Sequence, residues 1–428
     1  MEEKIVILGA GPAGLLLARL LSEQPDEQRE IHIYERASAL QDRSNEKSFS
    51  FAIFKRGFDA LGQIDGLEQA ARDRCVRIET RVQNWLPEDD RRGPVNNPFM
   101  LCERNELVQC LLESLESVSD SRIHIHFDHE CVDVDLESQT VTLNANGELL
   151  TEKYDLLFGA DGAGSALRRK LVADKGYACE DQPYSRVYRN FYLSARGREQ
   201  LDIRHNELHA WLLPGGLMVG AVPQQDNTVT CNLVFPMGSE EATSAEKQWA
   251  TLQEHCPEVV AAISKEEQQA FLERPILQCR TINMDCYHYE NHACLLGDAA
   301  HAVPPSVGQG CNSSLEDAVI LSRLLQEHNG DAGQAFATYS RDRVPDMHAL
   351  LKLSVYAMPL EPELRKEYET KNRRNEKLRK IIPWLKPSNL LDYLAQSTEP
   401  FSKTLQERKS WIDQVETSNK AFMAKQKG

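Results

Sequence analysis

The chain has 428 residues, of which 41% are hydrophobic and 27% are charged, and its formal net charge at pH 7 is −16. A chain of this length can bury a large core and is expected to form two or three domains. The negative charge argues against nucleic acid or an anionic membrane surface as the main partner, because both require a basic face.

The sequence gives no signal for a membrane span, a disulfide framework or a metal site. No apolar run approaches the roughly twenty residues that cross a bilayer, and the chain enters its first predicted strand without a signal peptide, so we expect a cytoplasmic protein. The eleven cysteines form no C-x-x-C pair and are expected to be reduced core thiols. The twelve histidines show no H-E-x-x-H or comparable spacing, so we predict no metal site.

A dinucleotide fingerprint opens the chain. An apolar strand pattern at residues 5–8 leads into G-x-G-x-x-G, formed by Gly9, Gly11 and Gly14, and then into a helical pattern at residues 15–21. Gly9 permits a tight turn, Gly11 lets the backbone approach a pyrophosphate, and Gly14 lets the helix pack closely on the strand. The helix N-terminus adds unpaired N–H groups that favour phosphate.

A second predicted strand, residues 31–34, ends at an acidic residue, Glu35. A carboxylate in this position can accept hydrogen bonds from both ribose hydroxyls. The strand, the helix and Glu35 together favour a dinucleotide site over an ordinary tight turn. We also place Ala13, within the fingerprint, and Arg36, after Glu35, among the cofactor-binding residues.

A second glycine-rich stretch lies far downstream. A strand pattern at residues 294–296 ends in Gly297 and Asp298, and the stretch G-Q-G-C-N at residues 308–312 precedes a helix predicted over residues 313–325. An acidic residue at a strand end and a glycine-rich loop entering a helix indicate a second polar clamp on the same ligand. An ordinary turn would explain Gly297 but not the second pair of glycines.

The intervening patterns divide the chain into three parts. The first is an α/β nucleotide-binding domain built from discontinuous segments, residues 1–72, 100–172 and 276–345. The second, residues 73–99 and 173–275, contains alternating strand patterns and reads as an inserted antiparallel sheet. The third, residues 346–428, is helical, highly charged and interrupted by prolines.

Within the first part, local patterns predict several elements. We expect helices over residues 54–67 and 104–115. Residues 123–127, 131–136 and 140–143 alternate like antiparallel strands.

Three motifs, in this order, resemble those of the single-component FAD-dependent aromatic hydroxylases of the para-hydroxybenzoate hydroxylase fold. They are the fingerprint ending in Glu35, the D-G motif GADGAGSALR at residues 159–168, and the G-D motif GDAAH at residues 297–301. Within that family, GQGCN, the stretch RVPDMHA at residues 343–349 and the tail at residues 381–393 are most similar to the kynurenine 3-monooxygenases.

The resemblance implies a Rossmann-like FAD-binding domain, an antiparallel-sheet substrate domain and a C-terminal helical region. It also implies an enzyme that takes electrons from NADPH or NADH and hydroxylates a kynurenine-like or tryptophan-derived aromatic substrate through a flavin C4a-hydroperoxide formed with dioxygen. No side chain is assigned a catalytic role, because the flavin performs the difficult step. His301 is interpreted as a structural hydrogen-bonding group, and we expect a monomer or homodimer.

The resemblance also assigns roles at the FAD end. Glu35 would bind the adenosine ribose, Arg104 would lie near the pyrophosphate, and Asp298 would bind the ribityl chain. The backbone around Gly310, Cys311 and Asn312 would lie near the isoalloxazine. Asp161 would serve FAD and the nicotinamide donor, or cap a helix, and Arg43 would lie near FAD or be a surface charge. The expected cofactor-binding residues are Gly9, Gly11, Ala13, Gly14, Glu35, Arg36, Arg43, Arg104, Asp161, Asp298, Pro305, Gly308, Gly310, Cys311 and Asn312.

The resemblance is thinner at the substrate end. Arg81 fits the arginine that binds the substrate carboxylate, and Tyr393 fits the distal tyrosine, so we assign both to the substrate together with Tyr356. Ala357 stands where the family has an asparagine after this tyrosine, and residues 95–99 contain no tyrosine. Because a site that loses polar partners usually changes its substrate, we expect an aromatic substrate related to tryptophan metabolism or to a pigment pathway and do not assign kynurenine itself.

Two other functions remain open from the sequence. A flavin-dependent halogenase shares the first motif, but residues 381–384, IIPW, lack its W-x-W-x-I-P pattern. A flavin-dependent oxidase of secondary metabolism, or a non-hydroxylating FAD-binding protein, would bind FAD without hydroxylating an aromatic ring.

Overall fold

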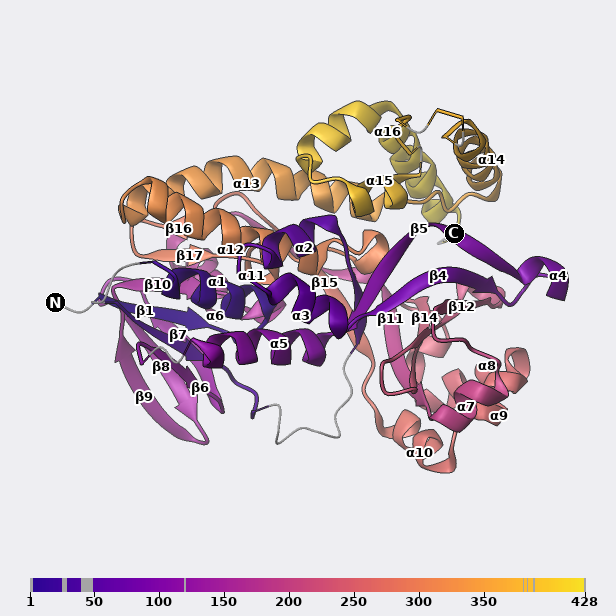
Figure 1. The fold of residues 1–428 in the computed structure, drawn as a ribbon, viewed down its shortest axis with the longest axis horizontal. Coiled ribbons are helices and arrows are strands. Elements are labelled where there is room, and N and C mark those ends of the chain that lie inside the picture. Colours follow the sequence, from indigo (N-terminus) through magenta and orange to yellow (C-terminus); the bar gives the residue numbers. More distant parts are fainter. Residues whose placement is uncertain are drawn as a thin grey trace.

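The computed structural model describes residues 3–24, 29–39, 49–118, 121–379, 381–382, 384–387 and 389–426. Its strands form a six-stranded, an eight-stranded and a three-stranded sheet. The six-stranded sheet and its helices occupy one half of the molecule, the eight-stranded sheet occupies the other, and the last helices pack along one side of both (Figure 1).

The six-stranded sheet has the order β16-β17-β10-β1-β2-β6, and all neighbours are parallel except β16 and β17. Residues 5–8 of β1 and all of β10 are buried, because helices cover both faces of the sheet. Its strands are β1 (Glu3–Leu8), β2 (Arg29–Tyr34), β6 (Ile123–His126), β10 (Leu156–Gly159), β16 (His288–Tyr289) and β17 (Ala293–Leu295).

One predicted pairing is wrong. The segment 123–127 was expected to join an antiparallel sheet, but β6 pairs in parallel with β2, with Ile31 opposite Ile123. Alternation of apolar and polar residues reveals a half-buried strand but not the direction of its partner. The other two segments do form an antiparallel sheet, made of β7 (His129–Asp135), β8 (Thr140–Ala145) and β9 (Glu148–Lys153).

Helices around the six-stranded sheet form the larger hydrophobic core. The predicted helix over 54–67 is instead two helices, because Gly66 adopts a positive φ of 74° between them. The helix expected from residue 313 begins three residues earlier, at Gly310. These helices are α1 (Pro12–Ser22), α2 (Lys55–Leu61), α3 (Leu67–Asp73), α5 (Arg104–Ser117), α6 (Ala166–Lys175), α11 (Asp298–His301), α12 (Gly310–Glu327) and α13 (Ala332–Val355).

The eight-stranded sheet has the order β15-β11-β14-β13-β12-β4-β5-β3. All its neighbours are antiparallel except β12 and β4. Its strands are β3 (Ser50–Ile53), β4 (Val76–Gln83), β5 (Arg92–Glu103), β11 (Cys179–Leu193), β12 (Glu207–Leu212), β13 (Met218–Pro223), β14 (Val229–Pro236) and β15 (Leu277–Met284).

One face of this sheet packs on short helices in a second hydrophobic core, which includes Phe191, Leu233, Trp249 and Phe271. The opposite face of the sheet does not take part in this second core. The helices are α7 (Ala195–Gln200), α8 (Ala245–His255), α9 (Pro257–Ala262) and α10 (Lys265–Glu273), while α4 (Glu88–Arg91) lies between β4 and β5.

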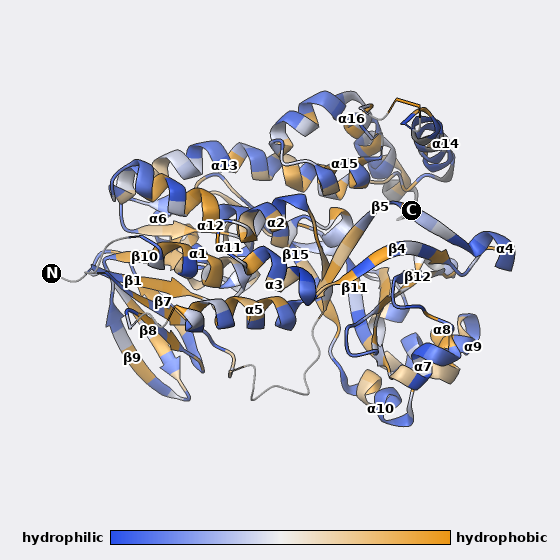
Figure 2. Ribbon diagram, in the orientation of Figure 1, coloured by the Kyte–Doolittle hydropathy of each residue, from blue (hydrophilic) through white to orange (hydrophobic). Residues whose placement is uncertain are grey.

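The C-terminal helices are α14 (Pro362–Arg379), α15 (Leu390–Gln396) and α16 (Phe401–Gln426). Figure 2 shows a largely hydrophilic α14, whereas β1 inside the sheet is hydrophobic. Within the described part of the chain, no helix combines the length and the apolar character needed to cross a membrane.

Candidate functional site

The three glycine-containing motifs meet at one edge of the six-stranded sheet. They follow β1, β10 and β17, which are adjacent and parallel, so their carboxyl ends lie together. A Cβ on Gly9, whose φ is +98°, would lie 2.6 Å from Ala160 O in the D-G motif. A Cβ on Gly297 would lie 3.4 Å from Ala13 Cβ. In open α/β sheets, this edge is where nucleotides bind.

The glycines of the fingerprint have different constraints. A Cβ on Gly14 would collide with Gly9 O, so this position requires glycine for packing. A Cβ on Gly11 would meet nothing closer than Arg104 Nη2, at 3.8 Å. Gly11 is also the N-cap of α1, and no side chain of the described residues caps that helix. No contact within the chain therefore requires glycine at this position. The open space beside Gly11 fits a pyrophosphate, which would face the N–H groups at the start of α1 and Arg104.

Glu35 lies at the end of β2 and faces the fingerprint. Its Oε2 accepts a hydrogen bond from Ala10 N at 2.9 Å, and its Oε1 accepts one from Ala37 N at 2.9 Å. A carboxylate has about four acceptor sites, so two remain for the ribose hydroxyls that the sequence analysis assigned to it. Arg36 is exposed beside it, and Arg43 lies outside the described residues.

One carboxylate oxygen of Asp161 caps the start of a helix, and the other has no hydrogen-bond partner among the described residues. Its Oδ2 accepts from Ala166 N, the first residue of α6, at 2.7 Å. Its Oδ1 is buried and has no hydrogen-bond partner among the described residues. Burial raises the pKa of this carboxyl. Because a buried polar atom without a partner is costly, Oδ1 fits a hydroxyl donor from a bound ligand.

A cavity of about 430 Å³ lies between the D-G loop and the eight-stranded sheet. Asp298 borders it and is exposed at the start of α11. A Cβ on Gly310, at the start of α12, would lie 3.9 Å from Asp298 Oδ1. The cavity is lined by Ala163, Gly164, Arg168, Arg169, Asp181, Gln278, Cys279, Arg280, Asp298, Ala302 and Val303.

Four charged residues of this cavity, Arg168, Arg169, Asp181 and Arg280, were not predicted as site residues from the sequence. Arg168 donates from Nη1 to Ala299 O at 2.9 Å and from Nη2 to Ala163 O, so it joins the D-G and G-D motifs. Arg280 pairs with Asp181 at 2.7 Å. Arg168 ends the D-G motif, which was a usable signal, whereas Asp181 and Arg280 meet only because β11 pairs with β15.

The G-Q-G-C-N loop is held by its own asparagine. Asn312 Oδ1 accepts from Phe54 N at 2.8 Å, and its Nδ2 donates to Ala52 O and Gly308 O at 2.9 and 2.8 Å. The Asn312 side chain therefore positions the loop, which leaves backbone groups to face a ligand. Burial raises the pKa of the neighbouring Cys311 thiol to about 12. Pro305 begins the short 3₁₀ turn that precedes this loop.

His301 belongs to a buried charge network behind the G-D motif. Its Nε2 lies 2.6 Å from Asp317 Oδ2, which also accepts from Gly297 N at 2.8 Å. The other oxygen of Asp317 accepts from Arg343 Nε at 2.6 Å. His301 is 2% exposed, so it positions the motif and does not line the cavity.

The three residues assigned to the substrate lie on separate elements. Arg81 is exposed on β4. Tyr356 ends α13, where burial and then the charge of Glu416 raise the pKa of its hydroxyl. Tyr393 is buried in α15, where its hydroxyl donates to Glu399 and accepts from Lys386 Nζ at 3.3 Å. No recorded contact between described residues joins these three side chains, so their substrate roles stay predictions.

Comparisons with known proteins agree with the arrangement of the motifs. The profile of a family described as FAD binding domain matches residues 2–354. Kynurenine 3-monooxygenase of Flavobacterium psychrophilum is 27% identical over 423 residues, which cover 94% of this chain and 91% of the relative. That of Drosophila willistoni is also 27% identical, with coverage of 97% and 91%.

A solved structure has the same fold. The tetrameric form of 2-methyl-3-hydroxypyridine-5-carboxylic acid oxygenase superposes with a TM-score of 0.64 at 20% identity, covering 82% of this chain and 90% of that one. The expected α/β architecture with a C-terminal helical region is thereby confirmed.

Proposed function

We propose that this chain, which belongs to the FAD binding domain family, hydroxylates a small aromatic substrate with a kynurenine-like, carboxylate-bearing side chain. The chain is an FAD-dependent aromatic monooxygenase that uses a nicotinamide donor and dioxygen. The observation that carries the proposal is the convergence of Gly9, Ala160 and Gly297 at adjacent strand ends. The bound flavin supplies oxygen activation, and the protein positions the ring and excludes water.

The residues present fit FAD at three points. Gly11 leaves space beside the N-terminus of α1 and Arg104. Glu35 retains acceptor sites for a ribose, and Asp161 carries a buried oxygen that lacks a partner in the described chain. These three groups lie at successive strand ends and would bind the dinucleotide along its length.

One face of the eight-stranded sheet carries the polar residues Arg81, Asn232 and Asn190, which supports a ligand with hydrogen-bonding groups. Directly paired residues of neighbouring strands point to the same face. The pairing therefore places Arg81 on the same face as Asn190, opposite the face that packs on α8 and α10. The intervening paired residues are Leu208, Ala210, Gly220 and Asn232.

Arg81 would pair with a carboxylate of the substrate. Asn190, on the same face, is only 6% exposed, and its Oδ1 has no hydrogen-bond partner among the described residues. Its strand lies four strand spacings from β4, about 19 Å, so Asn190 does not share a small substrate with Arg81. The helix α15 contacts β5, where Asn96 Nδ2 donates a hydrogen bond to Asp392 Oδ2 at 3.0 Å.

The test uses purified FAD-loaded protein, NADH and NADPH, and a panel of aromatic compounds. The panel contains kynurenine, its analogues without the carboxylate or the amine, and simple phenols. We expect an aromatic carboxylate to accelerate nicotinamide oxidation and to yield a product heavier by one oxygen atom. Nicotinamide oxidation that no compound stimulates, with all oxygen recovered as hydrogen peroxide, would favour an oxidase-type flavoprotein. A protein that cannot be reconstituted with FAD would contradict the whole assignment.

We further propose a nucleotide-binding domain, an inserted sheet domain and a C-terminal helical region, a cytoplasmic location and a monomeric or homodimeric state. The separate six-stranded and eight-stranded sheets support the division into domains, with residues 50–53 and 277–284 contributing β3 and β15 to the second sheet. Light scattering on the eluting peak of a size-exclusion column measures the oligomeric state, and a tetramer would contradict the proposal.

A further inference from the structure

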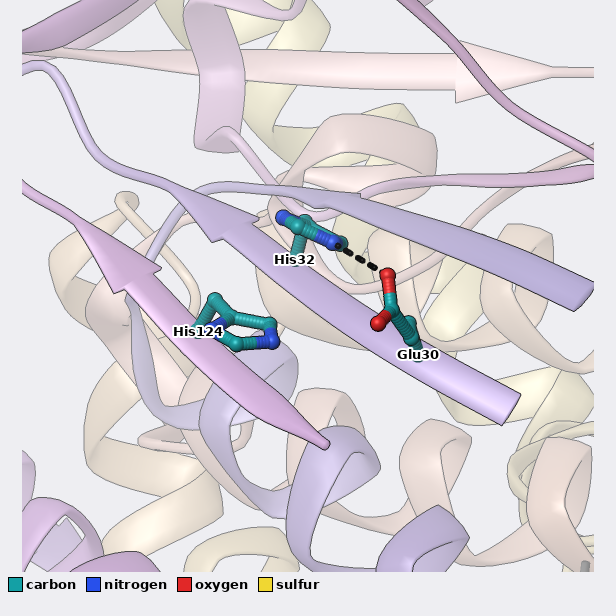
Figure 3. A group of neighbouring side chains, drawn as sticks. All are labelled: Glu30, His32 and His124. Atoms are coloured by element: carbon teal, nitrogen blue, oxygen red, sulfur yellow. Dashed lines mark hydrogen bonds and ion pairs between the residues drawn. The ribbon is translucent and has the colours of Figure 1, made fainter. Parts of the chain in front are cut away.

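A cluster of metal-ligating side chains lies at the edge of the six-stranded sheet, away from the motifs that hold FAD. Glu30 and His32 project from β2, and His124 projects from the neighbouring edge strand β6 (Figure 3). His32 and His124 are direct neighbours in the parallel register, and Glu30 precedes His32 by two residues on the same face. Strand pairing therefore brings together groups that are far apart in the sequence.

The donor atoms are close enough to share one ion. His32 Nε2 lies 3.3 Å from Glu30 Oε2, and one donor atom from each of the three residues lies within 4.8 Å of the others. Zn²⁺ binds nitrogen at about 2.0–2.1 Å, which puts two tetrahedral ligands about 3.3 Å apart. The His32–Glu30 distance already matches, and a side-chain rotation of His124 would bring in the third donor.

We propose that Glu30, His32 and His124 form a binding site for a borderline divalent ion such as Zn²⁺. Two imidazoles and one carboxylate suit Zn²⁺ and similar ions, whereas Mg²⁺ and Ca²⁺ prefer oxygen ligands alone. The Glu30 side chain is 40% exposed and that of His32 is 14% exposed, so an ion can enter from solvent. A water molecule would complete the coordination.

A third histidine, His126, orients His32. His126 Nε2 lies 3.2 Å from His32 Nδ1, the ring nitrogen that does not face Glu30. Such a contact fixes the ring and the tautomer of a metal-binding histidine. His126 also links the cluster to the nucleotide end, because its carbonyl oxygen accepts from Glu35 N at 2.9 Å.

The positive charge nearest to the cluster is already paired with a carboxylate. Lys4, the neighbour of Glu30 on β1, is paired with Glu152 at 2.6 Å, which offsets its repulsion of an incoming cation.

The proposal is tested by calorimetric titration of chelator-treated, FAD-loaded protein with ZnCl₂, and separately with MgCl₂. We expect saturable binding of about one Zn²⁺ and none of Mg²⁺. His124→Gln should weaken Zn²⁺ binding by at least about tenfold. The control, His205→Gln, changes an exposed histidine of the other sheet region and should bind like the unchanged protein. Circular dichroism and flavin content show whether each variant is folded.

A second measurement tests whether cysteine thiols, which also bind Zn²⁺, account for the binding. The melting temperature should rise with Zn²⁺ concentration in the unchanged protein and in thiol-alkylated protein, but not in His124→Gln. Absence of saturable binding would overturn the proposal. Binding that survives His124→Gln but disappears on alkylation would also overturn it, because it would assign the ion to thiols.

Discussion

Asp317 of α12 and Arg343 of α13 form an ion pair of 2.6 Å in which both side chains are almost completely buried. Arg343 also contacts Glu316 at 2.7 Å and Asp346 at 3.4 Å. Asp346 in turn accepts from Ser402 N, in α16, at 2.8 Å. The G-D motif, α12, α13 and the C-terminal helices are therefore connected through one set of buried charges.

Arg343→Met should strongly destabilise the protein. Removing one member of a buried ion pair leaves the other charge uncompensated, and this costs about 3–5 kcal/mol of unfolding free energy. Urea unfolding followed by circular dichroism measures the change. The matched control, Arg341→Met, removes an exposed arginine that pairs with exposed Asp342 and should change the free energy by about 0.5 kcal/mol or less. Equal effects of the two substitutions would contradict this interpretation of the network.

Asp317 should contribute to the pH dependence of stability. Burial raises the pKa of its carboxyl, but His301 and Arg343 outweigh this and hold it at about 2. Because an unfolded aspartate titrates near about 3.9, the stabilisation is complete above about pH 4 and is lost as the pH falls toward 2. Asp317→Asn should therefore flatten the slope of unfolding free energy against pH between 4 and 2. Urea titrations test this, with the exposed Asp65→Asn as the control; parallel curves for all three proteins would refute it.

Two glycine substitutions should separate folding from cofactor binding. Gly14→Ala places a Cβ against Gly9 O and should lower both the melting temperature and the flavin content. Gly11→Ala meets only ordinary contacts within the protein, so it should fold normally and lose mainly FAD affinity. Flavin absorbance after desalting and apoprotein melting curves measure the two effects. Normal FAD retention by Gly11→Ala would show that the pyrophosphate does not lie there.

Arg81→Met should raise the Michaelis constant for the aromatic carboxylate about tenfold or more while FAD stays bound, because a charge-assisted hydrogen bond contributes about 1.5–3 kcal/mol. Arg77→Met is the matched control, since Arg77 is also exposed on β4 and forms only an exposed ion pair with Glu79. Steady-state kinetics on the substrate found in the panel give the comparison. Loss of FAD from Arg81→Met, or equal kinetics of the two variants, would move the carboxylate site elsewhere.

Cys286 should be alkylated readily near neutral pH. Burial raises the pKa of its thiol, but hydrogen bonds with His288 and Ser340 outweigh this and lower it to about 7. The thiolate is the reactive form, so the rate of iodoacetamide labelling should rise through pH 7 and level off above it. Cys279, whose thiol pKa is raised by burial, serves as the internal comparison in peptide mass spectra. His288→Ala should move the midpoint upward, and an unchanged midpoint would show that His288 has no part in it.

Local signals in the sequence were sufficient for the nucleotide end. The strand, the glycines, α1 and Glu35 lie within a few tens of residues, where backbone geometry and hydrophobic periodicity follow from the residues themselves. The order of the three motifs likewise indicated the fold that the comparisons confirm. The residues that contact FAD remain predictions, although Asp161 showed both the helix cap and a buried oxygen without a partner in the described chain.

Only the tertiary structure decided which distant side chains meet. The alternation of isoleucine and histidine in β6 predicted a strand but not its parallel partner β2, and without that partner His32 and His124 have no relation. Asp317 lies within the helix predicted over residues 313–325, but only the packing of α13 places Arg343 against it. Strand pairing and burial depend on contacts between residues far apart in the chain, and single-sequence periodicity carries no information about them. The sequence by itself determined the class of cofactor, and the fold determined the charge network, the placement of Arg81 and Asn190 on one face of the sheet and the histidine cluster.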